Sequence, residues 1–279
     1  MNELLQSTTT GSAAFAVPLI ALGLMALEFL YGRLRHVDAY DARETAASWV
    51  IAVGNKVLRG VTAGALALPY MWAWDHRLFD IPLDSAWAVL GLVLGVEFFY
   101  YWHHVAMHRV KWLWATHGVH HSATRMNFSA AIRLGWGGDI TGGFLFYLPL
   151  AWFGFHPGAI VAALAIGLLY QFFLHTTLVP RLGPLEWVFN TPRHHCVHHA
   201  VNDACLDKNF GSMLIVYDRL FGTFAEAPKD EALRYGRKNS DIAAHRPIAI
   251  VLAGWQDIAR GVWTATSWRG RFAAAFGRP

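Results

Sequence analysis

Charged residues are scarce in this sequence. Asp, Glu, Lys and Arg make up 15% of its 279 residues, whereas hydrophobic residues make up 55%. A soluble domain averages about 25% charged residues, so the composition predicts an integral membrane protein. The thirteen tryptophans and nine tyrosines fit this prediction, since both favour membrane interfaces. The net charge is +4, but the basic residues are spread beside apolar segments instead of forming one stripe. We therefore expect no nucleic acid partner.

Cysteine is also rare, with only Cys196 and Cys205 in the chain. Two cysteines do not make a disulfide framework, and a reducing compartment is expected. The sequence also lacks a Gly-rich dinucleotide loop and a cysteine cluster, so a separate reductase must supply any electrons that its chemistry requires. Residues 1–3 lack the positive charge of a secretory signal, and the first apolar stretch is expected to stay as a membrane anchor.

Apolar stretches of about 20 residues predict membrane helices. Five stretches qualify, near residues 13–31, 55–74, 84–102, 139–155 and 158–178. The last two are joined only by the His156-Pro157 turn, so we expect a membrane hairpin that enters and returns to the same side. The predicted fold is all-α: a bundle of about four to five membrane helices with a cytoplasmic helical cap that carries a dinuclear metal site.

The distribution of basic residues predicts the orientation, since Lys and Arg accumulate on the cytoplasmic side. Residues 1–12 contain neither, whereas Arg33, Arg35 and Arg43 follow the first stretch. We therefore expect the N-terminus on the outer side, and three crossings that bring the chain to the cytoplasmic side at about residue 103.

Three regions follow from this topology. Residues 1–102 form the N-terminal membrane helices, 103–225 the histidine-rich region with the membrane hairpin 139–178, and 226–279 the C-terminal tail. In the tail, Trp255 and Phe272 are interspersed with arginines, a composition typical of a helix that lies in the membrane interface. A solvent-exposed tail is the alternative.

Histidine is the most informative residue type. Eight of the fifteen histidines fall into three clusters, namely His104 and His108; His117, His120 and His121; and His195, His198 and His199. Residues three and four apart share a helix face, so each cluster aims its imidazoles in one direction. Imidazole is the commonest metal ligand. Because burying imidazoles without partners costs free energy, the clusters predict a metal site, with enough ligands for two ions.

Several further histidines differ in their prospects as ligands. His175 ends the fifth apolar stretch at the depth where the clusters should meet, and we expect it to be a ninth ligand. His194 is expected to ligate the metal or to orient a ligand, and His103 to lie beside the site. The remaining histidines lie outside the clusters and are expected to bind no metal: His36, His76, His156 and His245.

The identity of the metal stays open at this point, because imidazole suits zinc, copper, iron and nickel. A zinc hydrolase often has a glutamate inside a His-Glu-x-x-His helix, and neither His117–His120 nor His195–His198 encloses one. Two irons can reduce and cleave O2 and so oxidise the unactivated C–H bonds of lipid.

The histidine motifs and the residues around them resemble the fatty acid hydroxylase superfamily, also called the sterol desaturase family. The resemblance covers roughly residues 90–225 and is nearest to the alkylglycerol monooxygenase-like and bacterial sterol desaturase-like branch. It rests on Tyr101-Trp102-His103-His104 through His121-Ser122, on 127–133, on Thr191-Pro192-Arg193 through His199, on Asp207-Lys208-Asn209-Phe210-Gly211, and on Asp218-Arg219 through Phe224.

The resemblance implies a membrane oxygenase with two non-haem irons and with the eight clustered histidines as iron ligands and catalytic residues. It departs from the common pattern at Val105 and Cys196, where arginine is frequent in the family. Neither change removes a ligand. Both leave the contacts to a substrate headgroup open, because an arginine beside the metal could bind an anionic group.

Polar residues near the motifs are candidates for orienting the ligands, since metal-bound imidazoles usually donate their second N–H to such groups. Glu97 sits where the family tends to place an acid, and either orients His104, ligates the metal, or is an interfacial carboxylate. Asn127 and Asp207 are further candidates; for Asn202 and Asn209, turn and capping roles are at least as well supported. Asp218 and Arg219 are expected to form a structural ion pair.

The expected reaction is hydroxylation of a lipid alkyl or ether-linked chain with O2 as co-substrate and two electrons. Lipid or sterol desaturation at the same centre is the near alternative, and the ligand spacing does not separate the two. Alternatives of another class are a zinc-dependent membrane hydrolase and a non-catalytic metal or haem site. Haem is disfavoured because the histidines crowd at one boundary.

Overall fold

The protein is described here by a computed structural model, which covers residues 2–279, with side chains described except for residues 2–17 and 63. The described chain is all-helical, as the sequence predicts, with isolated β-bridges at Phe189–Leu214 and Ala200–Tyr235. The elements are α1 (Asn2–Leu34), α2 (Ala42–Asp75), α3 (Ala86–Arg109), α4 (Lys111–His120), α5 (Phe128–Ala131), η1 (Asp139–Thr141), η2 (Gly143–Tyr147), α6 (Leu148–Phe153), α7 (Pro157–Leu174), η3 (Gly183–Trp187), α8 (Pro192–His199), η4 (Asp203–Cys205), α9 (Val216–Phe221), α10 (Pro247–Thr264) and α11 (Trp268–Phe276).

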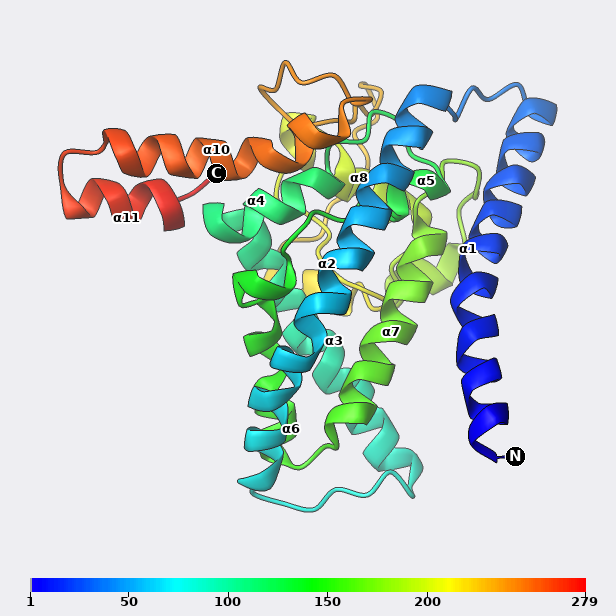
Figure 1. The fold of residues 1–279 in the computed structure, drawn as a ribbon. Helices are drawn as coiled ribbons and strands as arrows, with labels where there is room; N and C mark the ends of the chain where they lie inside the picture. The colour runs from blue at the N-terminus through cyan, green and yellow to red at the C-terminus, as the bar shows by residue number, and fades with distance from the viewer. Residues whose placement is uncertain (1) are drawn as a thin grey trace.

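The long helices α1, α2, α3 and α7 run along one axis, with the short α6 beside α2 (Figure 1). Their shared core contains Tyr70, Leu92, Val96, Leu150 and Ile160, all buried. Many large apolar side chains on the outer faces stay exposed, among them Val61, Leu68 and Leu169. The bundle therefore has an apolar core and apolar side chains exposed on its outer faces.

Only part of the expected membrane bundle is recognisable by helix length and hydropathy. Among the described residues α7 alone is a single helix long and apolar enough to cross a membrane, with a mean hydropathy of 1.9. The two parts of α2, Ala42–Thr62 and Gly64–Asp75, pass together and are bent by 53°. The expected count of four to five membrane helices thus stays a prediction.

Two predicted boundaries need correction. The second apolar stretch belongs to a helix that begins at Ala42 instead of near residue 55, because Asp41 caps it by accepting a hydrogen bond of 2.8 Å from the amide of Glu44. The fourth stretch is broken into η1, η2 and α6. Gly142 lies between η1 and η2 with φ of +90°, a conformation that other residues rarely adopt.

Helices α10 and α11 form a hairpin that projects sideways from one end of the bundle (Figure 1). Helix α10 packs closely on α4, because Gly254 leaves room for Ala115: a Cβ at Gly254 would lie 2.6 Å from the Cα of Ala115. Trp112 meets Trp255 edge to face at the same contact. This end of the bundle is also where α3, α4, α7 and α8 bring the histidines together.

Candidate metal centre

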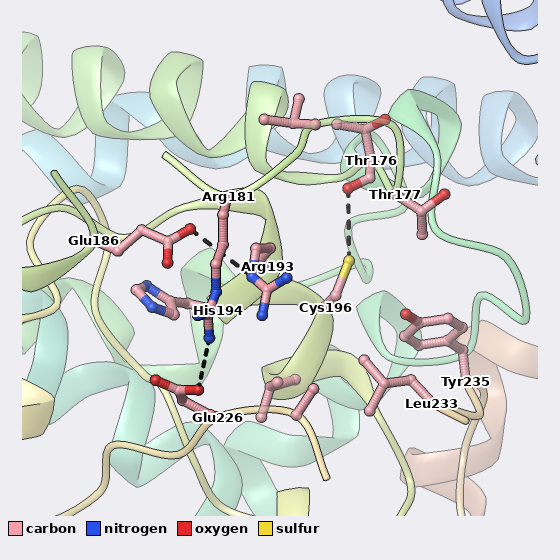
Figure 2. A pocket seen from close by; sticks show the side chains of 13 residues that line it. Thr176, Thr177, Arg181, Glu186, Arg193, His194, Cys196, Glu226, Leu233 and Tyr235 are labelled. Carbon is pink, nitrogen blue, oxygen red and sulfur yellow. Dashed lines mark hydrogen bonds and ion pairs between the residues drawn. The ribbon is translucent and has the colours of Figure 1, made fainter. Parts of the chain in front are cut away.

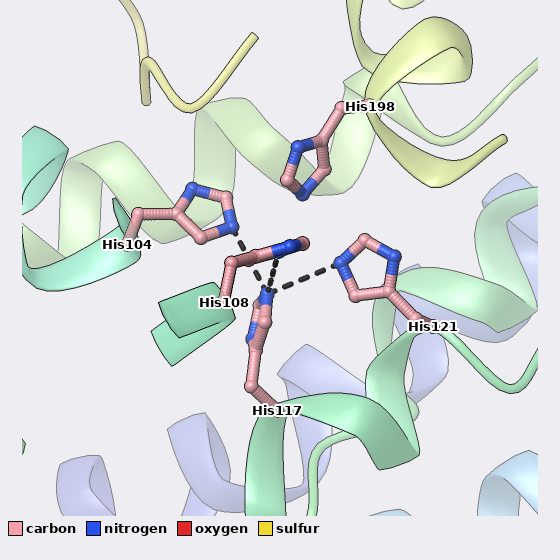
Figure 3. A group of neighbouring side chains, drawn as sticks. All are labelled: His104, His108, His117, His121 and His198. Atoms are coloured by element: carbon pink, nitrogen blue, oxygen red, sulfur yellow. Dashed lines mark hydrogen bonds between the residues drawn. The ribbon is translucent and has the colours of Figure 1, made fainter. Parts of the chain in front are cut away.

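Nine histidines converge in two groups at one end of the bundle. The first group is His104, His108, His117, His121 and His198 (Figure 3), and the second is His120, His175, His195 and His199. Within each group, one nitrogen of every imidazole lies within 4.8 Å of all the others. The two groups adjoin, since the rings of His121 and His199 stack with centroids 4.3 Å apart. The structure thus brings together all eight clustered histidines and adds His175.

Helical geometry divides the histidines between the groups. Each pair four residues apart enters the same group: His104 with His108, His117 with His121, and His195 with His199. The expectation that each cluster aims all its imidazoles in one direction is wrong for the residues three positions along. His120 and His198 point elsewhere on a helix of 3.6 residues per turn and enter the other group. Helices α4 and α8 therefore each serve both groups.

Backbone carbonyls hold the outer nitrogen of three of these imidazoles. The Nδ1 atoms of His104, His198 and His175 lie 2.7, 2.9 and 2.7 Å from the carbonyl oxygens of Phe210, Lys208 and Gln171. A carbonyl oxygen only accepts, so Nδ1 must carry the proton and donate it. The neutral ring then directs the lone pair of Nε2 into its group, as a metal ligand requires.

The inner nitrogens crowd together more closely than hydrogen bonding explains. The Nε2 atom of His117 lies 3.0, 3.1 and 3.2 Å from the Nε2 atoms of His104, His108 and His121. One nitrogen carries at most one proton, so three such contacts cannot all be hydrogen bonds. The Nε2 of His198 is buried without any partner. A cation would satisfy these converging lone pairs, and the donor set therefore fits a metal in each group.

Burial keeps the imidazoles neutral. Desolvation, and then the neighbouring histidines, hold the pKa of His117, His120, His121 and His195 well below the usual value. The pKa of His198 and His199 is lowered in the same way. Neutral imidazole is the form that binds metal, so the site is electrostatically prepared for cations and not for protons.

The metal-free protein should lose stability in acid. The folded-state pKa of these histidines lies below the unfolded value of about 6.5, so the unfolded chain binds more protons as the pH falls through that value. The contribution is fully present above about pH 6.5 and is lost below it. Melting in a chelator at pH 8, 7, 6 and 5 measures the effect; a melting temperature that does not change between pH 8 and 5 would contradict it.

The segment 207–211 positions the first group from outside. It supplies the carbonyls of Lys208 and Phe210, and Asp207 Oδ1 lies 3.6 Å from Nδ1 of His108. The contact with His108 lowers the pKa of the Asp207 carboxyl. Asp207 and Asn209 adopt φ of +55° and +57°. The expected role of Asp207 beside a histidine agrees with this geometry.

A buried carboxylate fixes this segment. Asp218 Oδ1 accepts hydrogen bonds of 2.7 Å from the amide of Phe210 and 2.6 Å from the hydroxyl of Thr223, and Oδ2 accepts one of 2.7 Å from the amide of Gly211. These contacts hold the Phe210 carbonyl against His104. The ion pair that we expected between Asp218 and Arg219 is not formed, because Asp218 is saturated by these donors and Arg219 packs over Trp187 and Phe224.

Replacing Asp218 with Asn should loosen the first group. The amide NH2 would face N–H or O–H donors and leave at least one of them unpaired in the interior, at a cost of about 1–3 kcal/mol of folding free energy. Metal affinity should fall by about 10–100-fold, as for other residues that orient a ligand. Melting of the metal-free protein and metal titration measure the two effects. Asp203→Asn, at an exposed position, is the matched control and should change neither.

Two residues expected near the ligands lie elsewhere. Glu97 is buried, and its Oε2 accepts hydrogen bonds of 3.0 and 2.9 Å from the amides of Met213 and Leu214. It therefore fixes the loop after residue 211 and is not seen against His104. Asn127 caps α5 through the amide of Ser129, 2.9 Å away. Capping satisfies its side-chain oxygen, so it does not orient an imidazole.

Other polar candidates hold loops. Asn202 accepts from the amide of Arg234 at 2.9 Å, and Asn209 accepts from the amide of Ala225 at the same distance. His103 lies 3.1 Å from the hydroxyl of Tyr147, outside both groups. These contacts agree with the turn and neighbouring roles that the sequence allowed.

His194 faces a separate cavity of about 230 Å³ on the other side of α8 (Figure 2). Its Nδ1 is buried without a partner, and its ring packs on Phe224. The arginines of this cavity are paired: Arg181 with Glu226 at 3.0 Å and Arg193 with Glu186 at 3.9 Å. His194 therefore belongs to neither histidine group, although it directly precedes His195.

Sequence reasoning missed the backbone partners of the histidines. The carbonyls of Lys208, Phe210 and Gln171 carry no residue-type signal. Gln171 stands four residues before His175 and is therefore on the same helix face, which is the one signal that could have identified it. Lys208 and Phe210 belong to the motif Asp207-Lys208-Asn209-Phe210-Gly211, but the sequence does not show that their carbonyls hold histidines.

Comparison with known proteins agrees with this site. Residues 89–223 match the family model described as Fatty acid hydroxylase. This stretch contains all nine grouped histidines, and it is a fatty acid hydroxylase domain. The resemblance that the sequence showed is thereby confirmed.

The similar curated proteins include two animal enzymes and a bacterial one. The chain is 36% identical to alkylglycerol monooxygenase of Homo sapiens over 254 residues, covering 85% of this chain and 56% of the relative. It is 39% identical to that of Danio rerio over 224 residues, covering 77% and 48%. Ornithine lipid hydroxylase OlsE of Rhizobium tropici is 34% identical over 154 residues, covering 53% and 44%. The chain spans about half the length of these relatives, and no solved structure matches it significantly.

Proposed function

We propose that this protein is a membrane-bound non-haem di-iron monooxygenase that hydroxylates a lipid alkyl or ether-linked chain with O2 and two electrons. The observation that carries the proposal is the convergence of nine histidines, seven buried and two half-buried, into two groups within a fatty acid hydroxylase domain. The relatives named as monooxygenases and as a lipid hydroxylase support the reaction class.

Each group would hold one iron. The first group offers five imidazoles and the second four, including His175, and none of these ligands is a glutamate. When bound, two irons supply the means to reduce and cleave O2 for attack on an unactivated C–H bond. The chain itself keeps the imidazoles neutral and fixes three of them through carbonyls.

The proposed membrane arrangement follows from the bundle. Helices α1, α2, α3 and α7, with outer faces rich in exposed apolar side chains, would cross or enter the bilayer, and η1 to α7 would form the predicted hairpin. Helices α4 and α8, which carry grouped histidines, lie at the end of the bundle away from the beginning of α1 (Figure 1). With the basic residues that follow α1, this supports a cytoplasmic metal centre and an outer N-terminus. The division of the chain into N-terminal membrane helices (1–102), a histidine-rich region (103–225) and a C-terminal tail (226–279) is part of this proposal.

The α10–α11 hairpin would lie on the membrane surface. It projects sideways from the bundle's long helices (Figure 1), and Trp263, Trp268 and Phe272 are 88%, 83% and 68% exposed. Arg271 lies over the ring of Trp268, so aromatic and basic groups occur together, as in interfacial helices.

Tryptophan replacement tests the hairpin's position. In the protein placed in brominated lipid, bromine near the headgroups should quench the fluorescence of Trp263 and Trp268. The double variant Trp263→Ala with Trp268→Ala should lose this part of the quenching. If bromine near the headgroups quenches neither tryptophan, the interfacial placement is wrong.

Labelled oxygen tests the reaction itself. Protein supplied with ¹⁸O2, a reductase and an ether lipid or fatty acyl lipid should place one labelled oxygen atom in the product. An alkene without label would instead indicate the desaturase alternative. Hydrolysis that proceeds without O2 would refute the oxygenase and favour a zinc enzyme.

A further inference from the structure

A second cavity, which we call the basic cavity, opens directly onto the metal centre. It measures about 300 Å³ and is lined on one side by His108, His121, His198 and His199, which belong to both histidine groups. Cationic side chains line the other side: Arg109, Arg237, Lys238 and Arg278. Positive charge and candidate metal ligands therefore line the same cavity.

The positive charge of the basic cavity is only partly balanced. Arg109 Nε lies 3.4 Å from Asp207, and Lys238 Nζ lies 2.5 Å from Asp203. Among the described residues that line the cavity, Asp207 is the one acidic side chain. Asp207 and Asp257 act electrostatically on Arg278 and Arg237, but neither arginine forms a direct ion pair within the described chain. The cavity behind α8 differs, because there each arginine has a glutamate partner.

Arg237 is half-buried, and a guanidinium there without an ion-pair partner is costly unless a ligand completes it, whereas Arg278 is exposed. Arginine binds phosphate and carboxylate groups through charge-assisted, often bidentate hydrogen bonds. The neutral imidazoles opposite do not compete for the anion, and bound metal ions would add further positive charge. A concave volume of this size suits a small group, whereas a docked protein needs a much larger surface of about 800 Å² per partner.

We propose that the basic cavity binds the anionic headgroup of the lipid substrate, a phosphate or a carboxylate, at Arg237 and Arg278. This inference rests on the proposed function and names its substrate class: an anionic amphiphile. It also places the oxidised carbon near the headgroup, because Arg237 and Arg278 line the same cavity as four of the grouped histidines. Arginine is frequent in the family at the positions of Val105 and Cys196, where it could bind an anionic group. In this chain Arg237 and Arg278 would make that contact instead.

Equilibrium binding tests the headgroup assignment separately from catalysis. Zinc-loaded full-length protein, which cannot activate O2, is titrated with a six-carbon ether lipid that carries a glycerol phosphate headgroup and with the same lipid lacking the phosphate. The phosphate form should bind at least about tenfold more tightly. Inorganic phosphate should compete with it, showing that the anion itself is recognised.

Paired variants locate the site. Arg237→Gln with Arg278→Gln should abolish the preference for the phosphate form, whereas Arg181→Gln with Arg193→Gln, in the cavity behind α8, should retain it. Unchanged metal content and melting temperature of both double variants show that they fold.

Two outcomes would overturn the proposal. The first is equal binding of the charged and neutral lipids by the wild-type protein. The second is a double variant at Arg237 and Arg278 that keeps the preference for the phosphate form. If the iron-loaded double variant is also reduced more slowly by an acidic electron-carrier protein, the cavity is a protein contact instead. Oxidation of neutral lipids by iron-loaded protein would meanwhile leave the proposed function intact, so the two failures are distinguishable.

Discussion

Replacing His120 or His198 with Ala is expected to abolish lipid oxidation and to lower metal content. His198 belongs to the first group and His120 to the second, so the two variants remove one imidazole from each proposed iron site. Changing a residue that only orients a ligand costs about 10–100-fold in affinity or activity, and losing the ligand itself should cost more. Product formation and metal analysis of each purified variant measure the two effects.

His76→Ala is the matched control for these variants. His76 is an exposed histidine at the end of α2, where its ring stacks on Trp72, and its loss should leave activity and metal content unchanged. Full activity in either His120→Ala or His198→Ala would refute the site. Equal melting temperatures of the metal-free proteins would show that lost activity does not reflect unfolding.

Replacing His175 with Ala should remove metal from one group and spare the other. Its Nε2 lies 3.1 Å from that of His120 and 3.0 Å from that of His195, and its loss leaves three imidazoles in the second group. We expect metal content to fall from about two ions to about one per chain, with lipid oxidation lost because both irons are required.

His194→Ala provides the control, because His194 directly precedes the third histidine cluster. His194 is as buried as its neighbours but faces the cavity behind α8, so this variant should keep both metal ions. If His175→Ala keeps both ions and full activity, His175 is not a ligand and the second group is reduced to three histidines.

Much of the site could be anticipated because helical spacing is a local property. The pairs His104 with His108, His117 with His121 and His195 with His199 are four residues apart, and the helices that contain them form where the pattern indicates. His175 could be placed by depth alone, since it ends an apolar helix at the level of the clusters. These predictions needed no knowledge of tertiary contacts.

The remaining features depend on contacts between distant segments. Glu97 bonds to amides more than a hundred positions away at Met213 and Leu214, and the carbonyl of Phe210 reaches His104 from a loop. No periodic pattern encodes such pairings. The histidines of α4 and of α8 are likewise divided between both groups, and this division depends on how α3, α4, α7 and α8 pack together.

The basic cavity was also beyond sequence reasoning. Arg109 ends α3, Arg237 lies in the loop before α10, and Arg278 follows α11, so three separate segments contribute its charge. Each arginine alone resembles an ordinary surface residue. Only the fold shows that these arginines line the basic cavity together with four of the grouped histidines.

The most direct test of the central claim is metal analysis of the full chain purified from iron-replete cells. The account predicts two irons per chain, held by the two histidine groups and lost together with lipid oxidation when a chelator removes them. One zinc ion per chain without iron, in a protein whose activity does not require O2, would contradict it.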